Sequence, residues 1–130
     1  MIILTLRTDK PEAELGLFND EKQLAYRKWQ AHLELSKTIH NEIEEILNKS
    51  SISLGELGGI VCFKGPGSFT GLRIGLSVAN ALAYAQAIPV VATTGENWIQ
   101  TGIKKLLAGQ DDRIALPEYG RPAATTPPKK

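Results

Sequence analysis

The sequence has one cysteine, two histidines and nearly balanced charges. The lone Cys62 excludes a disulfide within the chain, and its position in an expected buried strand argues against a catalytic thiol. With 15 basic and 14 acidic residues the formal net charge is +1, which argues against a protein that grips nucleic acid by its own charge. No Asp, Glu or Cys grouping accompanies His32 or His40. Both are therefore typical of a helix surface, and we expect no metal site.

Long apolar runs are also absent. No run reaches the roughly 20 residues that span a membrane, and the apolar start at residues 1–6 is too short for a signal peptide. We therefore expect a cytoplasmic protein without membrane contact. The length of 130 residues suits one domain with a sizeable core.

The most informative stretch covers residues 58–94 and is typical of a strand, a glycine loop, a helix and a second strand. Residues 60–63 are apolar with β-branched members, and the glycine-proline-glycine of residues 65–67 cannot continue them. Arg73 is the only charged residue between Gly65 and Gly95. A helix so apolar should be buried on two sides, by the sheet and by a neighbouring helix or a partner chain.

Small residues recur at every fourth position of this helix, at Gly71, Gly75, Ala79 and Ala83. They share one helix face, so another helix or the sheet can approach that face closely. Packing within the chain and contact with a partner are both consistent with this pattern.

The glycine loop also suggests a phosphate site, because a helix N-terminus aims backbone N–H groups at an anion. The loop residues are Lys64, Gly65, Pro66, Gly67, Ser68, Phe69, Thr70 and Gly71. No lysine follows Gly71 as a Walker loop requires, and the glycines are spaced one residue too far apart for a dinucleotide fingerprint. We therefore expect no bound cofactor.

The remaining segments complete an α/β pattern. Three antiparallel strands and two flanking helices are expected at residues 1–6, 14–18, 21–29, 33–48 and 98–107. Ser53 with Glu56, and Thr93 with Glu96, have the spacing of reciprocal helix caps. Right-handed crossovers then give a mixed five-stranded sheet with helices on both faces, the ribonuclease-H-like half of actin-like ATPases. We expect this domain over residues 1–108 and an extended tail over residues 109–130.

The segment KGPGSFTGLRIGLSVANALAYAQAIPVVATTGENW closely resembles the TsaB (YeaZ) family, which takes part in making threonylcarbamoyladenosine in tRNA. Residues 64–75 carry the specific part, and a weaker match covers residues 3–107. Pro117, Tyr119 and Arg121 resemble a segment near the family's C-terminus. The resemblance therefore implies a shortened member that lacks most of the second domain.

The resemblance implies a scaffold without catalytic activity of its own. Such a scaffold pairs with the catalytic subunit TsaD through its first two helices, the ATPase TsaE docks on that pair, and tRNA is met only through the complex. Alone, the chain is expected to form a homodimer through the same helices. The candidate interface residues are Leu35, Ile39, Ile43, Leu72, Arg73, Leu76, Ala79 and Ala83.

Two features separate the sequence from enzymes of the superfamily. TsaD has a metal-binding histidine pair after the strand that follows the small-residue helix, whereas residues 93–98 contain no histidine. TsaB-like proteins usually end the first strand with Asp-Thr, and here the pair is Arg7-Thr8. The alternatives are a small nucleotide-dependent enzyme or peptidase, although Ser68 has no base nearby in sequence, and a homodimeric module with another partner.

Overall fold

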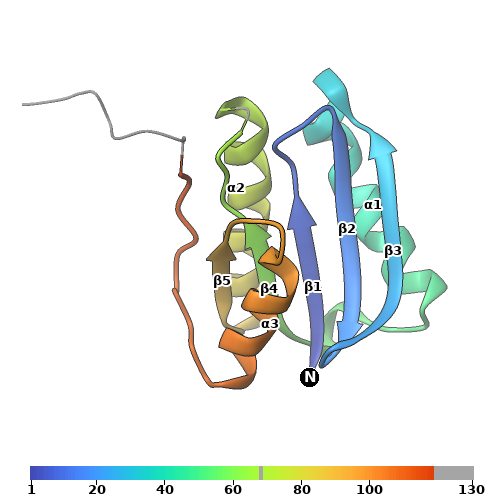
Figure 1. Ribbon diagram of the computed structural model, residues 1–130. Helices are drawn as coiled ribbons and strands as arrows, with labels where there is room; N and C mark the ends of the chain where they lie inside the picture. Colours follow the sequence, from blue (N-terminus) through green and yellow to red (C-terminus); the bar gives the residue numbers. More distant parts are fainter. Residues whose placement is uncertain (68, 119–130) are drawn as a thin grey trace, which may run out of the picture.

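The computed structural model describes residues 1–67 and 69–118, so Ser68 and residues 119–130 lie outside the described part. Its centre is a five-stranded sheet in the order β3-β2-β1-β4-β5 (Figure 1). The strands are β1 (Ile2–Arg7), β2 (Glu12–Asn19), β3 (Lys22–Gln30), β4 (Leu57–Phe63) and β5 (Val90–Thr93). The helices are α1 (Leu35–Lys49), α2 (Phe69–Gln86) and α3 (Trp98–Leu107), with single 3-10 turns at His32–Glu34 and Leu54–Glu56.

The sheet is mixed, as the sequence predicts. β1 pairs antiparallel with β2 and parallel with β4, and β4 pairs parallel with β5. Helices α1 and α2 lie on one face of the sheet and α3 lies on the other (Figure 1). The expected mixed sheet with helices on both faces is therefore confirmed.

Apolar content decreases from the centre of the sheet to its β3 edge. Four consecutive residues of β1, from Ile3 to Leu6, are fully buried because both faces of this strand are covered. β3, at the edge, is exposed or half-buried along its whole length. This gradient matches the nearly continuous apolar run of β1 and the more polar sequence of β3.

Helix α1 buries one stripe, made of Leu35, Ile39, Ile43, Ile46 and Leu47. The expected cap at Ser53 forms, since its backbone N–H donates to the Glu56 carboxylate at 2.8 Å. The expected cap between Thr93 and Glu96 is wrong. Thr93 is buried at the end of β5, where its hydroxyl donates to the Trp98 carbonyl at 2.7 Å, and α3 begins after Asn97 without a side-chain cap.

The small-residue face of α2 packs within the domain. A side-chain carbon on Gly75 would lie within 3.1 Å of three Thr8 atoms, and Ala79 and Ala83 are buried. The Thr8 hydroxyl also donates to the Gly71 carbonyl at 2.8 Å. The four-residue spacing of small residues therefore reflects packing within the chain, because it allows α2 to lie close to the sheet and to the end of β1.

The segment that follows α3 runs beside β5 (Figure 1). Residues 110–118 contain neither helix nor strand, yet the Ala115 side chain is only 2% exposed. The expected tail at residues 109–130 therefore begins as a docked segment. Its remainder, including Tyr119 and Arg121, lies outside the described residues.

Candidate partner-binding surface and glycine loop

The glycine loop joins β4 to α2 and is held by other parts of the chain. The Thr94 hydroxyl donates to the Gly65 carbonyl. A side-chain carbon on Gly67 would lie 3.2 Å from the Asp9 carboxyl carbon, so the β1–β2 connection approaches the loop closely. Lys64 is half-buried. Ser68 and the side chain of Phe69 lie outside the described part of the structure.

An ion pair lies at the C-terminal end of β1. The Arg7 guanidinium donates to both carboxylate oxygens of Asp9, at 2.8 and 3.3 Å, and lies 3.9 Å above the centre of the Phe63 ring. Asp9 is only 8% exposed. Both oxygens of this buried carboxylate are therefore occupied by a guanidinium, which leaves Asp9 poorly placed to act as a base or as a metal ligand.

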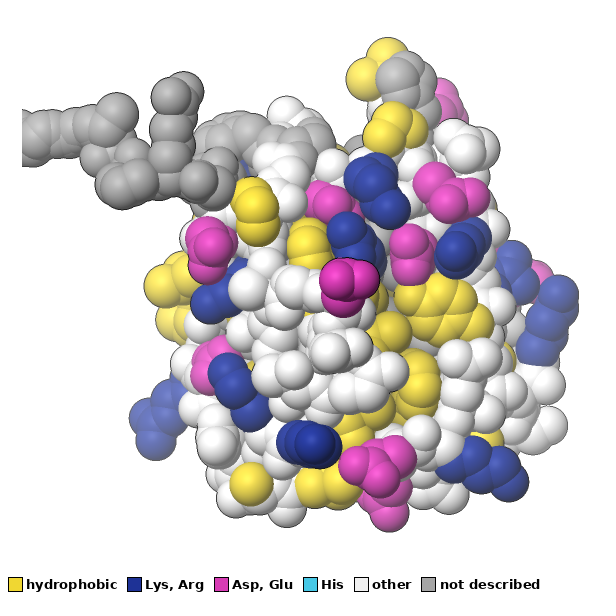
Figure 2. Space-filling model, viewed as in Figure 1, with side chains coloured by type: hydrophobic (Ala, Val, Ile, Leu, Met, Phe, Trp, Pro, Cys, Tyr) yellow, Lys and Arg dark blue, Asp and Glu magenta, His cyan; other side chains and the backbone are white. Residues whose placement is uncertain are grey.

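The face of the sheet that carries α3 shows charges of both signs side by side over its upper half (Figure 2). The ion pairs among the described residues include Arg7 with Asp9 and Lys10 with Glu14. No patch of a single sign is visible on this face among the residues described. The mixed charge agrees with the small net charge of the whole sequence.

The eight candidate interface residues lie on α1 and α2, but most of them point inward. Arg73 is exposed. The other seven are buried in the core of the domain: Leu35, Ile39, Ile43, Leu72, Leu76, Ala79 and Ala83. Most of the side chains that a partner could reach therefore lie on the opposite side of the same two helices.

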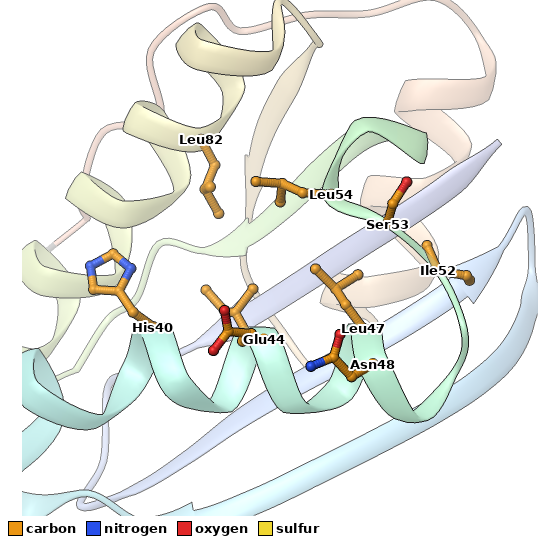
Figure 3. Close-up of a pocket in the computed structure, with 9 residues that line it drawn as sticks. His40, Glu44, Leu47, Asn48, Ile52, Ser53, Leu54 and Leu82 are labelled. Atoms are coloured by element: carbon orange, nitrogen blue, oxygen red, sulfur yellow. The ribbon is translucent and has the colours of Figure 1, made fainter.

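Two hollows lie between the outward sides of α1 and α2, and His40 borders both of them. The first, of about 360 Å³, is formed by α1, by the connection to β4 and by Leu82 of α2 (Figure 3). Its apolar side chains include Leu47, Leu54 and Leu82, while His40 and Glu44 supply polar atoms. The second, of about 350 Å³, is lined by Ser36, Ile39, His40, Arg73, Ile74, Ser77 and Val78. This surface is partly apolar and has a polar border, as protein interfaces commonly do.

Of the eight candidate residues, Ile39, Ile43 and Arg73 line these hollows. Apart from Arg73, the polar lining residues were not among the candidates, because the sequence reasoning ranked positions by hydrophobicity, which favours the core. A usable signal was nevertheless present in the helix period. If Gly75 and Ala79 face the sheet, then Ser77, which is two residues from each of them, must lie on the opposite side of α2. Knowing which way the small residues point would have been enough to name Ser77, but not the lining residues of α1 or of the connection to β4.

Burial perturbs two titratable groups. It raises the pKa of the Cys62 thiol to about 12, so the thiol stays protonated and unreactive at neutral pH. Burial also raises the pKa of Tyr26, with a further contribution from the bond that its hydroxyl donates to Glu14 at 2.5 Å. Neither residue faces the two hollows.

Among residues 1–67 and 69–118, no three His, Cys, Asp or Glu side chains come together in a way that could hold a metal ion. Within the same residues, every helix is too short or too polar to cross a membrane.

Solved structures with a similar fold include YeaZ and RuvC proteins. YeaZ from Pseudomonas aeruginosa superposes with a TM-score of 0.67 and 24% identity, over 72% of this chain and 43% of that one. RuvC from Thermus thermophilus superposes with a TM-score of 0.52 and 13% identity, over 95% and 86%. The fold is thus the ribonuclease-H-like α/β half that actin-like proteins share.

Sequence comparisons identify the family. The family model described as "TsaD: tRNA N6-adenosine threonylcarbamoyltransferase" matches residues 29–95. The TsaB protein of Escherichia coli is 30% identical over 125 residues, covering 88% of this chain and 52% of the relative. That of Bacillus subtilis is 31% identical over 98 residues, covering 72% and 41%. A tRNA N6-adenosine threonylcarbamoyltransferase of Geotalea daltonii is 39% identical over 89 residues, covering 68% and 24%.

The chain belongs to this TsaD family, and specifically to its TsaB (YeaZ) members. The resemblance predicted from residues 64–75 is confirmed. The chain spans about half the length of the Escherichia coli relative and less of the others.

Proposed function

We propose that the chain is a non-catalytic subunit of the machinery that makes threonylcarbamoyladenosine in tRNA, and that it pairs with a TsaD-like catalytic subunit. The observation that carries this proposal is the family match over residues 29–95. That span contains α1, the glycine loop and α2. The relatives named as tRNA threonylcarbamoyladenosine biosynthesis protein TsaB support the same pathway.

The surface for this partner is the outward side of α1 and α2, with its two hollows on either side of His40. An apolar side chain of the partner fits between Leu54 and Leu82, beside the carboxylate of Glu44. A second copy of the chain would take the same surface when the TsaD-like subunit is absent, and a TsaE-like ATPase would dock on the pair. Contact with tRNA would come through the complex, since the chain's own net charge is +1.

Three observations support a role without catalysis. Both oxygens of Asp9 are engaged by Arg7. Cys62 is fully buried. Residues 93–98 offer no histidine as a metal ligand. The purified chain alone should therefore not hydrolyse ATP, and turnover that disappears on Ser68→Ala would contradict the proposal.

Partner binding is tested by isothermal titration with the TsaD-like protein of the same organism. Val78→Arg places a charged side chain in the second hollow and should weaken binding at least about tenfold, because interface cores exclude unpaired charge. Ser36→Arg, at an exposed position of α1 on the same hollow, should act in the same direction.

The matched control is Tyr84→Arg, which lies on α2, is 91% exposed and lines neither hollow. It should bind like the unmodified chain. If Val78→Arg and Ser36→Arg both fold, as judged by circular dichroism, and both bind normally, the partner surface lies elsewhere.

A further inference from the structure

The segment after α3, residues 110–118, covers the outer edge of β5. It leaves the helix through Gly109, at φ +85°, and then runs along the strand (Figure 1). The Val90 N–H donates to the Asp111 carboxylate at 3.1 Å, and the Ala92 N–H donates to the Asp112 carboxylate at 2.8 Å. In return, the Asp112 N–H donates to the Val90 carbonyl at 2.8 Å. Two side-chain carboxylates and one amide thus occupy the positions that another strand would fill.

Its middle is attached to α2 by a reciprocal pair. The Asn80 side chain donates to the Ala115 carbonyl at 3.0 Å and accepts from the Ala115 N–H at 2.7 Å. The Ala115 methyl is buried, whereas Ile114 and Leu116 are 62% and 66% exposed. The segment is therefore held mainly by polar contacts, with little apolar burial.

Its far end meets the glycine loop. The Glu118 N–H donates to the Lys64 carbonyl at 2.7 Å, and the Lys64 ammonium lies 3.9 Å from the Glu118 carboxylate. Gly65 has φ +110°, and a side chain there would collide with the Glu118 carbonyl oxygen. Two constraints therefore favour glycine at position 65: its backbone conformation and the close approach of this segment.

We infer that the outer edge of β5, Asn80 and the residues Lys64 and Gly65 form a binding site for an extended acidic peptide, and that residues 110–118 occupy this site as an intramolecular ligand. The site has the features of strand addition, in which backbone hydrogen bonds supply affinity and a small pocket accepts one side chain. Here the edge amides of β5 bind carboxylates, the pocket accepts Ala115, and Lys64 receives the acidic end.

This inference requires the segment to open without unfolding the domain. Segments with few buried apolar contacts open locally at a much lower free energy than the core. Hydrogen exchange on the full chain measures this opening, because the N–H groups of Val90 and Ala92 are bonded to the segment's carboxylates. Asp112→Ala should reduce the protection of Ala92 at least about tenfold, while the Val91 amide inside the sheet keeps its protection.

Two variants make the exchange test specific. Asp112→Asn keeps an acceptor oxygen and should keep most of the protection, whereas Gln110→Ala alters an exposed neighbouring side chain and should change nothing. Unchanged protection in Asp112→Ala would overturn the inference. A loss of protection throughout β4 and β5 would also overturn it, because the segment would then be part of the core rather than a ligand.

Peptide binding tests the site itself. A synthetic peptide with the sequence of residues 110–118, QDDRIALPE, should bind Asp112→Ala at least about tenfold more tightly than the unmodified chain, whose own segment competes at a high effective concentration. Asn80→Leu should abolish this binding, since it removes both bonds to the peptide backbone. Equal binding of a scrambled peptide, or no binding to Asp112→Ala at millimolar peptide, would overturn the inference.

Discussion

Replacing Gly75 by alanine tests whether α2 lies as close to β1 as the structure shows. A β-carbon at this position would lie 3.0 Å from the Thr8 methyl carbon and 3.1 Å from its β-carbon, with the Thr8 hydroxyl oxygen closer still. Thr8 is only 1% exposed, and its hydroxyl donates to the Gly71 carbonyl. Relief of the clash therefore requires either rotation of Thr8, which breaks that bond, or movement of the helix away from the strand.

The expected effect is the balance of three terms. Alanine favours an internal helix position over glycine by about 1 kcal/mol. Overpacking a core costs roughly 1 to 3 kcal/mol, and loss of a buried hydrogen bond costs roughly 1 to 3 kcal/mol more. The steric terms outweigh the propensity, so Gly75→Ala should lower the free energy of unfolding by roughly 1 to 5 kcal/mol. The melting temperature should fall by roughly 4 °C for each kcal/mol.

Urea denaturation followed by circular dichroism measures this change. Gly55→Ala is the matched control, since a side chain there meets nothing within 4 Å and should leave stability nearly unchanged. Combining Gly75→Ala with Thr8→Ala removes the two closest atoms, so the double variant should be more stable than the sum of the single effects predicts, by at least about 1 kcal/mol. If Gly75→Ala is as stable as the unmodified chain or more so, the small-residue face does not pack on Thr8.

Three further predictions concern pH, thiol chemistry and the C-terminus. Because the pKa of Tyr26 is raised in the folded state, the unfolded chain loses that proton first, and stability should fall as the pH rises above about 10. Tyr26→Phe should make this fall less steep, and an unchanged pH profile would contradict the assignment. Cys62 should react with a thiol reagent at pH 8 only after unfolding, because the group is buried and its pKa is raised to about 12. Deleting residues 125–130 should leave the melting temperature within a few degrees, and a large fall would mean that these residues dock.

Most of the fold could be predicted from the sequence because the pattern of apolar residues has a clear period in each segment. The stripe at Leu35, Ile39 and Ile43 identified α1, and the nearly continuous apolar run at residues 1–6 identified a central strand. The loop at residues 65–67 separated β4 from α2 because glycine and proline continue neither element.

The sequence did not predict which side of α2 faces the sheet. Nearly all of its sides are apolar, so no polar stripe indicates which side faces solvent. The three-dimensional structure resolves this, because Thr8 leaves no room for a side chain at position 75, and Ala79 on the same helix face is buried. Large residues such as Leu72 fill the core beside this contact. Hydrophobicity alone therefore selected mainly buried positions as the candidate interface.

The docking of the C-terminal segment could not be predicted from the sequence, for a different reason. Its contacts use Asp112 and Asn80, two polar residues separated by a strand and a helix, and neither belongs to an apolar period or a local motif. Backbone groups of β5 and of Lys64 supply the other partners, and these are the same for any sequence. Only the three-dimensional arrangement shows that residues 110–118 close an edge.

The partner surface and the docked segment share a border on α2. Ser77 lines the hollow toward α1, and it also lines one of about 350 Å³ that includes Asn80, Ala115 and Pro117. A partner that extends over Ser77 therefore comes within reach of the segment. Binding free energies are reciprocal, so a partner that favours the closed segment must bind the closed form more tightly by the same factor. Asp112→Ala should then weaken that partner's binding, and the partner should raise the protection of Ala92. A partner confined to the hollow at Leu54 and Leu82 would change neither quantity, so the two measurements together distinguish how far along α2 the interface extends.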